Sequence, residues 1–252
     1  MKAALTRAVL PRGNDLVHQL QLERGCSCAW VASGGALLDF ENLAISHRGL
    51  TTSMLSEPEH KQLKEIAHEP LLKLRKQSDA AVVGRGTAAT DQELAEAFYQ
   101  LLAGFTHLIA TILDLDSQSL SPGMLEHVTP RLKAAMAFTE LKEAMSIERA
   151  FVCGILSLPE PAVAHLPKRA FADFVLCLEK QRADKAAVRL AAPPHMLHIL
   201  LAAFKLHPEL EALQGLHAHS YARTHIAHTL RAHARIRSRA CTFILLRQPA
   251  RR

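Results

Sequence analysis

The chain has 252 residues and a net charge of +6, and its 49% hydrophobic and 21% charged residues are an ordinary globular balance. Aromatic residues make up only 5%, alanine and leucine are abundant, and runs of alternating β-branched residues are lacking, which argues against a sheet protein. The length allows one large domain or two modest ones.

The positive charge is confined to the C-terminal end. Eight of the 30 lysines and arginines follow Glu211, the last acidic residue, so residues 1–211 carry 22 basic and 24 acidic groups. We interpret residues 212–252 as a basic, Arg/His-rich tail that is solvated. Binding of nucleic acid or of an acidic partner is the weaker alternative for this tail, and it would be strongly salt-dependent.

Capping and turn residues predict about eight helices, four in each half of the chain. Those of the first half cover residues 14–33, 37–55, 59–76 and 91–115, with loops at 84–86 and 117–123. Those of the second half cover residues 124–158, 168–190, 194–205 and a segment from 208 onward. The short loops indicate an all-α fold of two antiparallel four-helix bundles that share long helices, one over residues 14–116 and one over 122–211.

The sequence indicates a cytoplasmic protein. The apolar segment 98–115 contains His107 and Asp114 in helical periodicity, which is typical of a core helix and not of a membrane span. Residues 1–13 lack the apolar stretch of a secretory signal. The cysteines form no zinc-type pair and are interpreted as reduced, mostly core residues: Cys26, Cys28, Cys153, Cys177 and Cys241.

Two arginines lie on helical stripes that are otherwise apolar. Arg24 follows Glu23 and shares its stripe with Leu16, Leu20, Cys28 and Val31. Arg149 follows Glu148 and shares its stripe with Leu141, Met145, Val152, Cys153 and Leu156. A core-facing arginine needs an anion, because an unpaired buried charge is costly. The residues around Arg24 and around Arg149 are arranged alike, which suggests that two halves of the chain face one anion. The alternative is internal ion pairing with Glu23, Glu148 or another carboxylate.

Two segments carry a resemblance to a known family. Residues 16–27 read LVHQLQLERGCS, and residues 141–150 read LKEAMSIERA. They resemble the two hallmark segments of the NIT domain, a nitrate- and nitrite-sensing module. The HRGLTT segment at residues 47–52 resembles a divergent form of a further family segment whose Gln and Asp are both lost here. The LLKLRKQSD segment at residues 71–79 looks like another.

The resemblance implies an all-helical sensory domain, over about residues 14–211, with an anion pocket where two bundles meet. The implied ligand-binding residues are Arg24 and Arg149, with support from Arg48, Ser27, Glu23 and Glu148. The chemistry suits this role, because the planar fork of a guanidinium matches two oxygens of nitrate or nitrite. An anion between two arginines relieves their repulsion and lets the bundles close, which is the differential affinity that a switch requires.

The expected function is therefore a sensor of nitrate, nitrite or a similar oxyanion that signals by rearrangement of helical bundles. The alternative is a helical interaction scaffold that has kept the fold and lost anion binding. We expect no enzyme activity, cofactor, metal site or membrane contact, since the acidic pairs Glu140/Glu143 and Asp114/Asp116 indicate only solvated faces. The expected partners are the anion, a signalling protein and, as a further option, a second copy of the chain.

Overall fold

Helices are the only regular elements in the part of the chain that the structure describes. A computed structural model describes residues 2–83, 90–118 and 130–191, and it confirms the expected all-α class. The elements are α1 (Lys2–Ala32), α2 (Leu38–Ser56), the short 3-10 helix η1 (Pro58–His60), α3 (Lys61–Val83), α4 (Asp91–Gln118), α6 (Pro130–Ser157), α7 (Glu160–Val163) and α8 (Lys168–Ala191).

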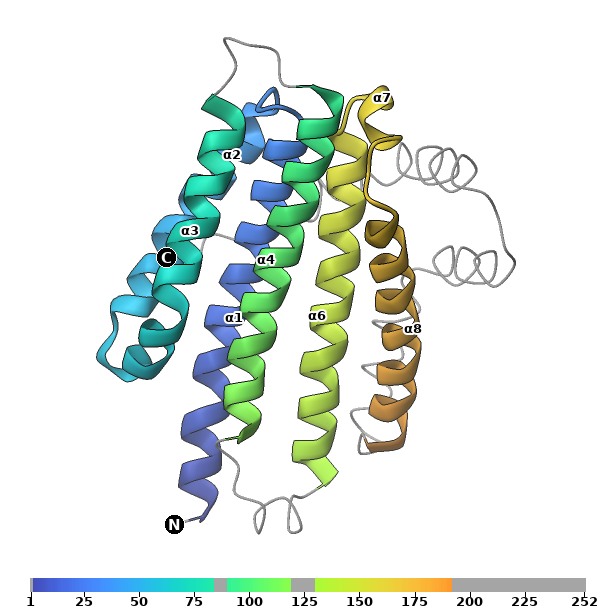
Figure 1. Cartoon of the computed structure of the whole chain (residues 1–252). Helices are drawn as coiled ribbons and strands as arrows, with labels where there is room; N and C mark the ends of the chain where they lie inside the picture. Colours follow the sequence, from blue (N-terminus) through green and yellow to red (C-terminus); the bar gives the residue numbers. More distant parts are fainter. Residues whose placement is uncertain (1, 84–89, 119–129, 192–252) are drawn as a thin grey trace. The chain divides into compact units, whose positions relative to one another are not determined.

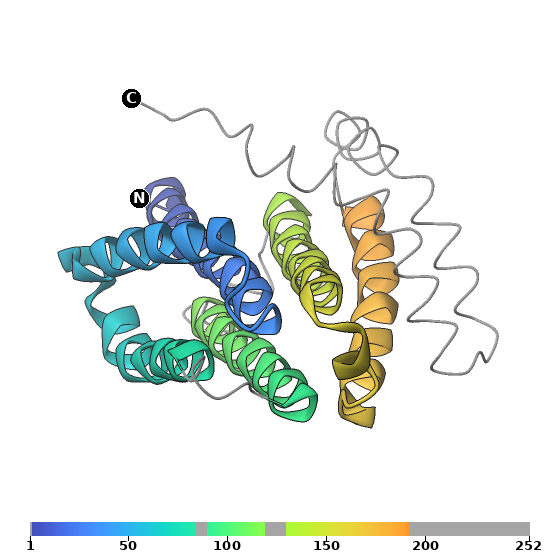
Figure 2. The ribbon, with the colours of Figure 1, turned by 90° about the horizontal axis from the view of Figure 1, so that it is seen from above.

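The first four long helices pack as a bundle. Successive long helices run in opposite directions (Figure 1), as the short loops predicted. Helix α1 packs against α2 and α4, and α3 packs against α4, so the four helices surround a common core when they are seen from above (Figure 2). This bundle positions one face of α1 against α2 and α3.

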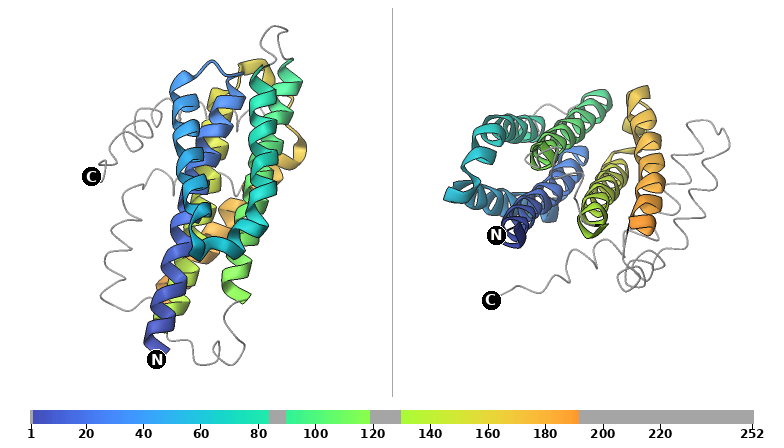
Figure 3. Two further views of the ribbon diagram at one scale, coloured as in Figure 1. Left: turned by 90° about the vertical axis from the view of Figure 1, so that its left-hand side faces the viewer. Right: turned by 90° about the horizontal axis from the view of Figure 1, so that it is seen from below.

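The other face of α1 meets α6. These two helices run parallel, because Asn14 lies near Thr139 at one end of the contact and Arg24 binds Ser146 further along. Helix α8 then packs against α6 (Figure 3), so α6 is covered on two sides. Helix α1 therefore contacts both halves of the described chain, and so does α4, which also packs against α6 and α7.

Glycine ends α1 and proline begins η1 where the sequence predicted, whereas the expected helix start at residue 124 lies outside the described residues. Gly34 (φ 60°) and Gly35 (φ 77°) terminate α1, and the amide of Gly35 donates to the carbonyl of Trp30 at 2.9 Å. Only glycine adopts such positive φ values readily, so this stop is local chemistry. Pro58 begins η1 and Pro130 is the first residue of α6.

Helix α4 provides much of the core. Its segment Asp91–Leu115 is long and apolar enough to cross a membrane by length and composition alone, with a mean hydropathy of 1.3. Its bulky side chains are instead buried inside the helical assembly: Phe98, Leu101, Phe105, Leu108, Ile109 and Ile112. Gly154 of α6 lies against the Phe98 ring, and a methyl group there would overlap the ring. Phe151 of α6 then stacks on Phe174 of α8, with ring centroids 4.5 Å apart.

Several expectations need correction or fall outside the described ranges. Asn14 and Asp15 do not cap a helix, because α1 begins earlier, at Lys2. Helix α3 continues to Val83 with Pro70 inside it. Cys26 and Cys28 are buried as expected, and burial raises the pKa of each thiol to about 12. The loop at 84–86, most of the loop at 117–123, the helices at 194–205 and from 208, Cys241 and the tail 212–252 lie outside the described residues.

Candidate functional site

Arg24 is fully buried, as its stripe predicted, and its guanidinium binds a carboxylate. Its side chain has no exposed surface, and Nη1 and Nη2 donate to the two oxygens of Glu143 at 2.6 and 3.2 Å. Nη2 also donates to the hydroxyl of Ser146 at 2.9 Å, and Nη1 donates to that of Thr106 at 3.2 Å. Arg24 thus joins α1 to α6 through a two-oxygen contact, which is the strong form of a charged hydrogen bond. It joins α1 to α4 through the hydroxyl of Thr106.

The carboxylate partner is a residue that the sequence placed on a solvated face. Glu143 is 7% exposed, and it also accepts a hydrogen bond from Gln21 at 2.7 Å, so that expectation is wrong. Glu140 is exposed, as expected, and pairs with Lys180. The error has a physical reason: α6 lies between α1 and α8, so side chains on two of its faces are buried.

Arg149 is exposed, so the expectation that it faces the core is also wrong. Its stripe-mates Met145 and Val152 are only partly buried. The charge of Arg149 nevertheless influences His18, which lies on α1 where this helix packs against α6. Burial, and then the positive charges of Lys142 and Arg149, lower the pKa of His18 on α1. Arg149 thus lies beside the α1–α6 seam, outside the Arg24–Glu143 contact.

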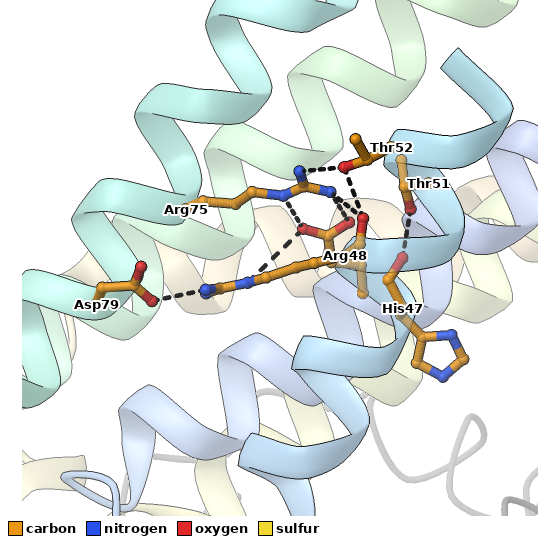
Figure 4. A network of polar contacts seen from close by, with 7 residues as sticks. His47, Arg48, Thr51, Thr52, Arg75 and Asp79 are labelled. Carbon is orange, nitrogen blue, oxygen red and sulfur yellow. Dashed lines mark hydrogen bonds and ion pairs between the residues drawn. The ribbon is translucent and has the colours of Figure 1, made fainter. Parts of the chain in front are cut away.

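Glu23 lies on a different side of α1 from Arg24 and binds two arginines of the first bundle. Its carboxylate is fully buried and accepts from Nε and Nη2 of Arg75 at 2.7 and 2.9 Å (Figure 4). Nε of Arg48 lies 4.0 Å from the same carboxylate. The guanidinium of Arg48 also donates to Asp79 at 2.7 Å and lies 5.8 Å from the centre of the Trp30 ring.

Thr52 fills the position where the family pattern has an acidic residue. Its hydroxyl accepts from Nη1 of Arg75 at 2.9 Å and donates to the carbonyl of Arg48 at 2.8 Å (Figure 4). The same carbonyl accepts from Nη2 of Arg75 at 3.0 Å. The segments 47–52 and 71–79 therefore meet in space, where a neutral hydroxyl and a backbone oxygen accept from the Arg75 guanidinium.

Two buried donors near the Arg24 contact have no acceptor within the described part of the chain. They are Nε of Arg24 and the hydroxyl of Ser27, one turn further along α1. Glu148, the other expected supporting residue, is 8% exposed and accepts from Gln181 of α8 at 3.0 Å. The structure thus places Arg24 where α1 meets α6, and it places Glu23 with Arg48 and Arg75 of the first bundle and Arg149 at the surface. Ser27 lies one turn from both Glu23 and Arg24.

The comparison with protein families agrees with this geometry. The family model for nitrate and nitrite sensing, NIT, matches residues 15–222, which is most of the chain. The chain belongs to the NIT family. NIT is a family of sensory and not of enzymatic domains. Neither the curated proteins nor the solved structures contain a significant match to the chain.

In this NIT chain the two segments that resemble the family meet in space. Arg24 comes from the first segment and Glu143 from the second, and the two residues meet where α1 packs against α6. The residues that sequence reasoning missed are Gln21, Thr106 and Glu143. Glu143 belongs to the second hallmark of this NIT chain, so its place in that segment was the available signal.

The half-buried histidines of this region predict a pH dependence of stability. Burial lowers the pKa of His18 and of His47 from their ordinary value of 6.5. Below pH 6.5 the unfolded chain binds protons that the folded chain does not, so stability is complete above this pH and is lost as the pH falls. We expect urea denaturation to show a decline between pH 7 and 5 of at most about 1.4 kcal/mol per pH unit for each histidine, reduced by solvent screening.

The variant His18→Gln should make this decline shallower. The matched control is His107→Gln, on the exposed side of α4. If His18→Gln and His107→Gln had the same slope as the original chain, the burial of His18 would not be the cause.

Proposed function

We propose that this chain binds nitrate, nitrite or a similar small oxyanion, with Arg24 at the centre of the site and Arg149 as the second cation. The observation that carries this proposal is the bidentate contact of buried Arg24 with a planar oxyanion group, the Glu143 carboxylate. Nitrate and nitrite offer two oxygens in a similar arrangement. The donors that hold the planar carboxylate of Glu143, between the two segments that resemble the family, can also hold a planar nitrate or nitrite ion.

In this proposal the Glu143 carboxylate is an internal competitor of the ligand. An incoming anion takes its place on Arg24, and the free donors Nε of Arg24 and the Ser27 hydroxyl supply further hydrogen bonds. The displaced carboxylate cannot stay buried beside a second anion, because two like charges in a poorly solvated site repel strongly. Binding therefore requires α6 to shift relative to α1.

Arg149 completes the charge balance of the bound state. Arg24 and Arg149 together carry two positive charges, which match the single charges of the ligand and of Glu143. Arg149 lies on the same helix as Glu143, so a shift of α6 that moves the carboxylate out also moves this arginine. A ligand that favours one helix arrangement over another is a switch. The output passes to a protein partner, or to a second copy of the chain, in the cytoplasm.

Titration calorimetry on the full chain tests the proposal. We expect nitrate or nitrite to bind with a Kd between micromolar and millimolar, since a few charge-assisted hydrogen bonds suffice for that range. Glu143→Gln should tighten binding about ten-fold, because a neutral amide competes less well for Arg24. Arg149→Ala should weaken binding, whereas Arg169→Ala, which removes an 82% exposed arginine of α8, should not.

A helical scaffold that has lost the ligand is the second candidate, because Glu143 already satisfies the Arg24 fork and Arg149 is exposed. The two candidates differ in one measurement. A sensor melts at a higher temperature when millimolar nitrate or nitrite is added, because a ligand that binds only the folded state stabilises it. A scaffold shows no such shift, and its Glu143→Gln variant gains none.

A further inference from the structure

A cavity of about 210 Å³ lies away from the Arg24 site, between α3 and α4 and above α1. Buried residues, one from each helix, form its floor: Val31, Ser78 and Leu101. Exposed Gln77 and Gln100 stand at its rim. All of its lining residues are uncharged.

Small side chains create this space. Helices α3 and α4 approach closely at Gly104, which lies against Leu74. One to two turns away the facing residues are Ser78 and Ala80 on α3 and Ala97 on α4. These short side chains do not fill the space between the two helices, so a cavity remains.

The hydroxyl of Ser78 sets this cavity apart from an ordinary packing defect. Ser78 is 1% exposed, and its Oγ has no hydrogen-bond partner within the described residues. Helical hydroxyls usually bond back to the carbonyl four residues earlier. Among the described residues, these hydroxyls do so: Thr51, Thr52, Ser56, Thr106, Thr111, Thr139 and Ser157. An unpaired buried hydroxyl is unfavourable, so Ser78 requires a hydrogen-bond partner from outside the described residues.

We propose that this cavity is a second ligand site, which binds a small uncharged organic molecule with an apolar body and one hydroxyl or amide group. The apolar body lies on Val31 and Leu101, and the polar group pairs with the hydroxyl of Ser78. The volume suits a molecule with a single ring, since a cavity of about 150 Å³ holds benzene. A charged ligand is disfavoured, because the lining residues offer it no counter-charge.

The test uses two probes of equal shape, phenol and toluene, which differ in the hydroxyl group. Each is titrated into the full chain, and binding is followed by the backbone amide chemical shifts of residues 77–80 and 97–101. We expect both probes to bind and to move these signals. The Ser78→Ala variant should weaken phenol about five-fold, the value of one hydrogen bond, and leave toluene unchanged.

Variants that fill the cavity complete the test. Ala97→Leu should abolish binding of both probes, and Ala80→Leu at the exposed rim serves the same purpose if Ala97→Leu fails to fold. Ala103→Leu, on an exposed face of the same helix α4, should change neither affinity. The proposal is overturned if neither probe moves these signals, if Ser78→Ala affects both probes equally, or if the filled variants still bind. None of these outcomes depends on anion binding, because the two sites share no residue.

Discussion

Replacing Arg24 by leucine should lower the free energy of unfolding by about 3–5 kcal/mol. The loss arises because the buried carboxylate of Glu143 is left without its counter-charge, and not because contacts of the arginine itself are removed. Glu143 is 7% exposed, and without Arg24 its carboxylate keeps only the hydrogen bond from Gln21. A buried carboxylate without a counter-charge is strongly unfavourable. Chemical denaturation of the Arg24→Leu chain, followed by circular dichroism, measures the loss directly.

A double substitution separates the structural role of this pair from the proposed binding role. Arg24→Leu with Glu143→Leu removes both charges, and apolar residues of similar size often replace a buried pair with little loss of stability. We expect the double variant to recover most of the stability and to bind neither nitrate nor nitrite. A double variant as unstable as Arg24→Leu alone would contradict the buried-charge explanation. A stable double variant that still binds the anion would exclude Arg24 from the site.

The second large effect is expected at Arg75. Its guanidinium provides both close contacts to the fully buried carboxylate of Glu23, and Arg48 lies 4.0 Å away. Arg75→Ala should therefore lower the free energy of unfolding by about 3–5 kcal/mol, measured by the same denaturation experiment. Arg48→Ala is the matched control from the same network. Its closest carboxylate belongs to Asp79, whose side chain is 49% exposed, so a smaller loss of about 1 kcal/mol or less is expected.

The ratio of the stability losses of Arg75→Ala and Arg48→Ala shows which arginine neutralises Glu23. Equal losses for Arg75→Ala and Arg48→Ala would mean that both arginines share the charge of Glu23, in spite of their different distances. In that case Glu23→Gln should restore stability to both variants. If Arg75 alone neutralises Glu23, then Glu23→Gln should rescue only the Arg75→Ala chain.

The helices were largely predictable because their ends rest on local chemistry. Gly34 and Gly35 stop α1 whatever packs around them, and Pro58 begins η1. The start of α1 was not predictable in this way. Asn14 and Asp15 are good capping residues, but nothing in their local sequence distinguishes a cap from a position inside a longer helix.

The site was predictable only in part because burial depends on how many neighbours a helix has. A single apolar stripe was the right assumption for Arg24. It failed on α6, which has neighbours on two sides, so that Glu143 is buried and Arg149 is exposed. The residue types in the hallmark segments predicted a charged contact between the halves. The identity of the partner required the three-dimensional arrangement.

The consecutive residues Glu23 and Arg24 restrict how α1 can move. Neighbouring positions on a helix differ by about 100°, and these two are held by partners on different sides, Arg75 and Glu143. A rotation of α1 about its own axis by about 30° would displace atoms at its surface by about 3 Å, enough to strain both contacts. While both contacts are intact, α1 is therefore held against rotation about its axis. Until one of them is released, a displacement transmitted through α1 is expected to be a sliding or tilting motion.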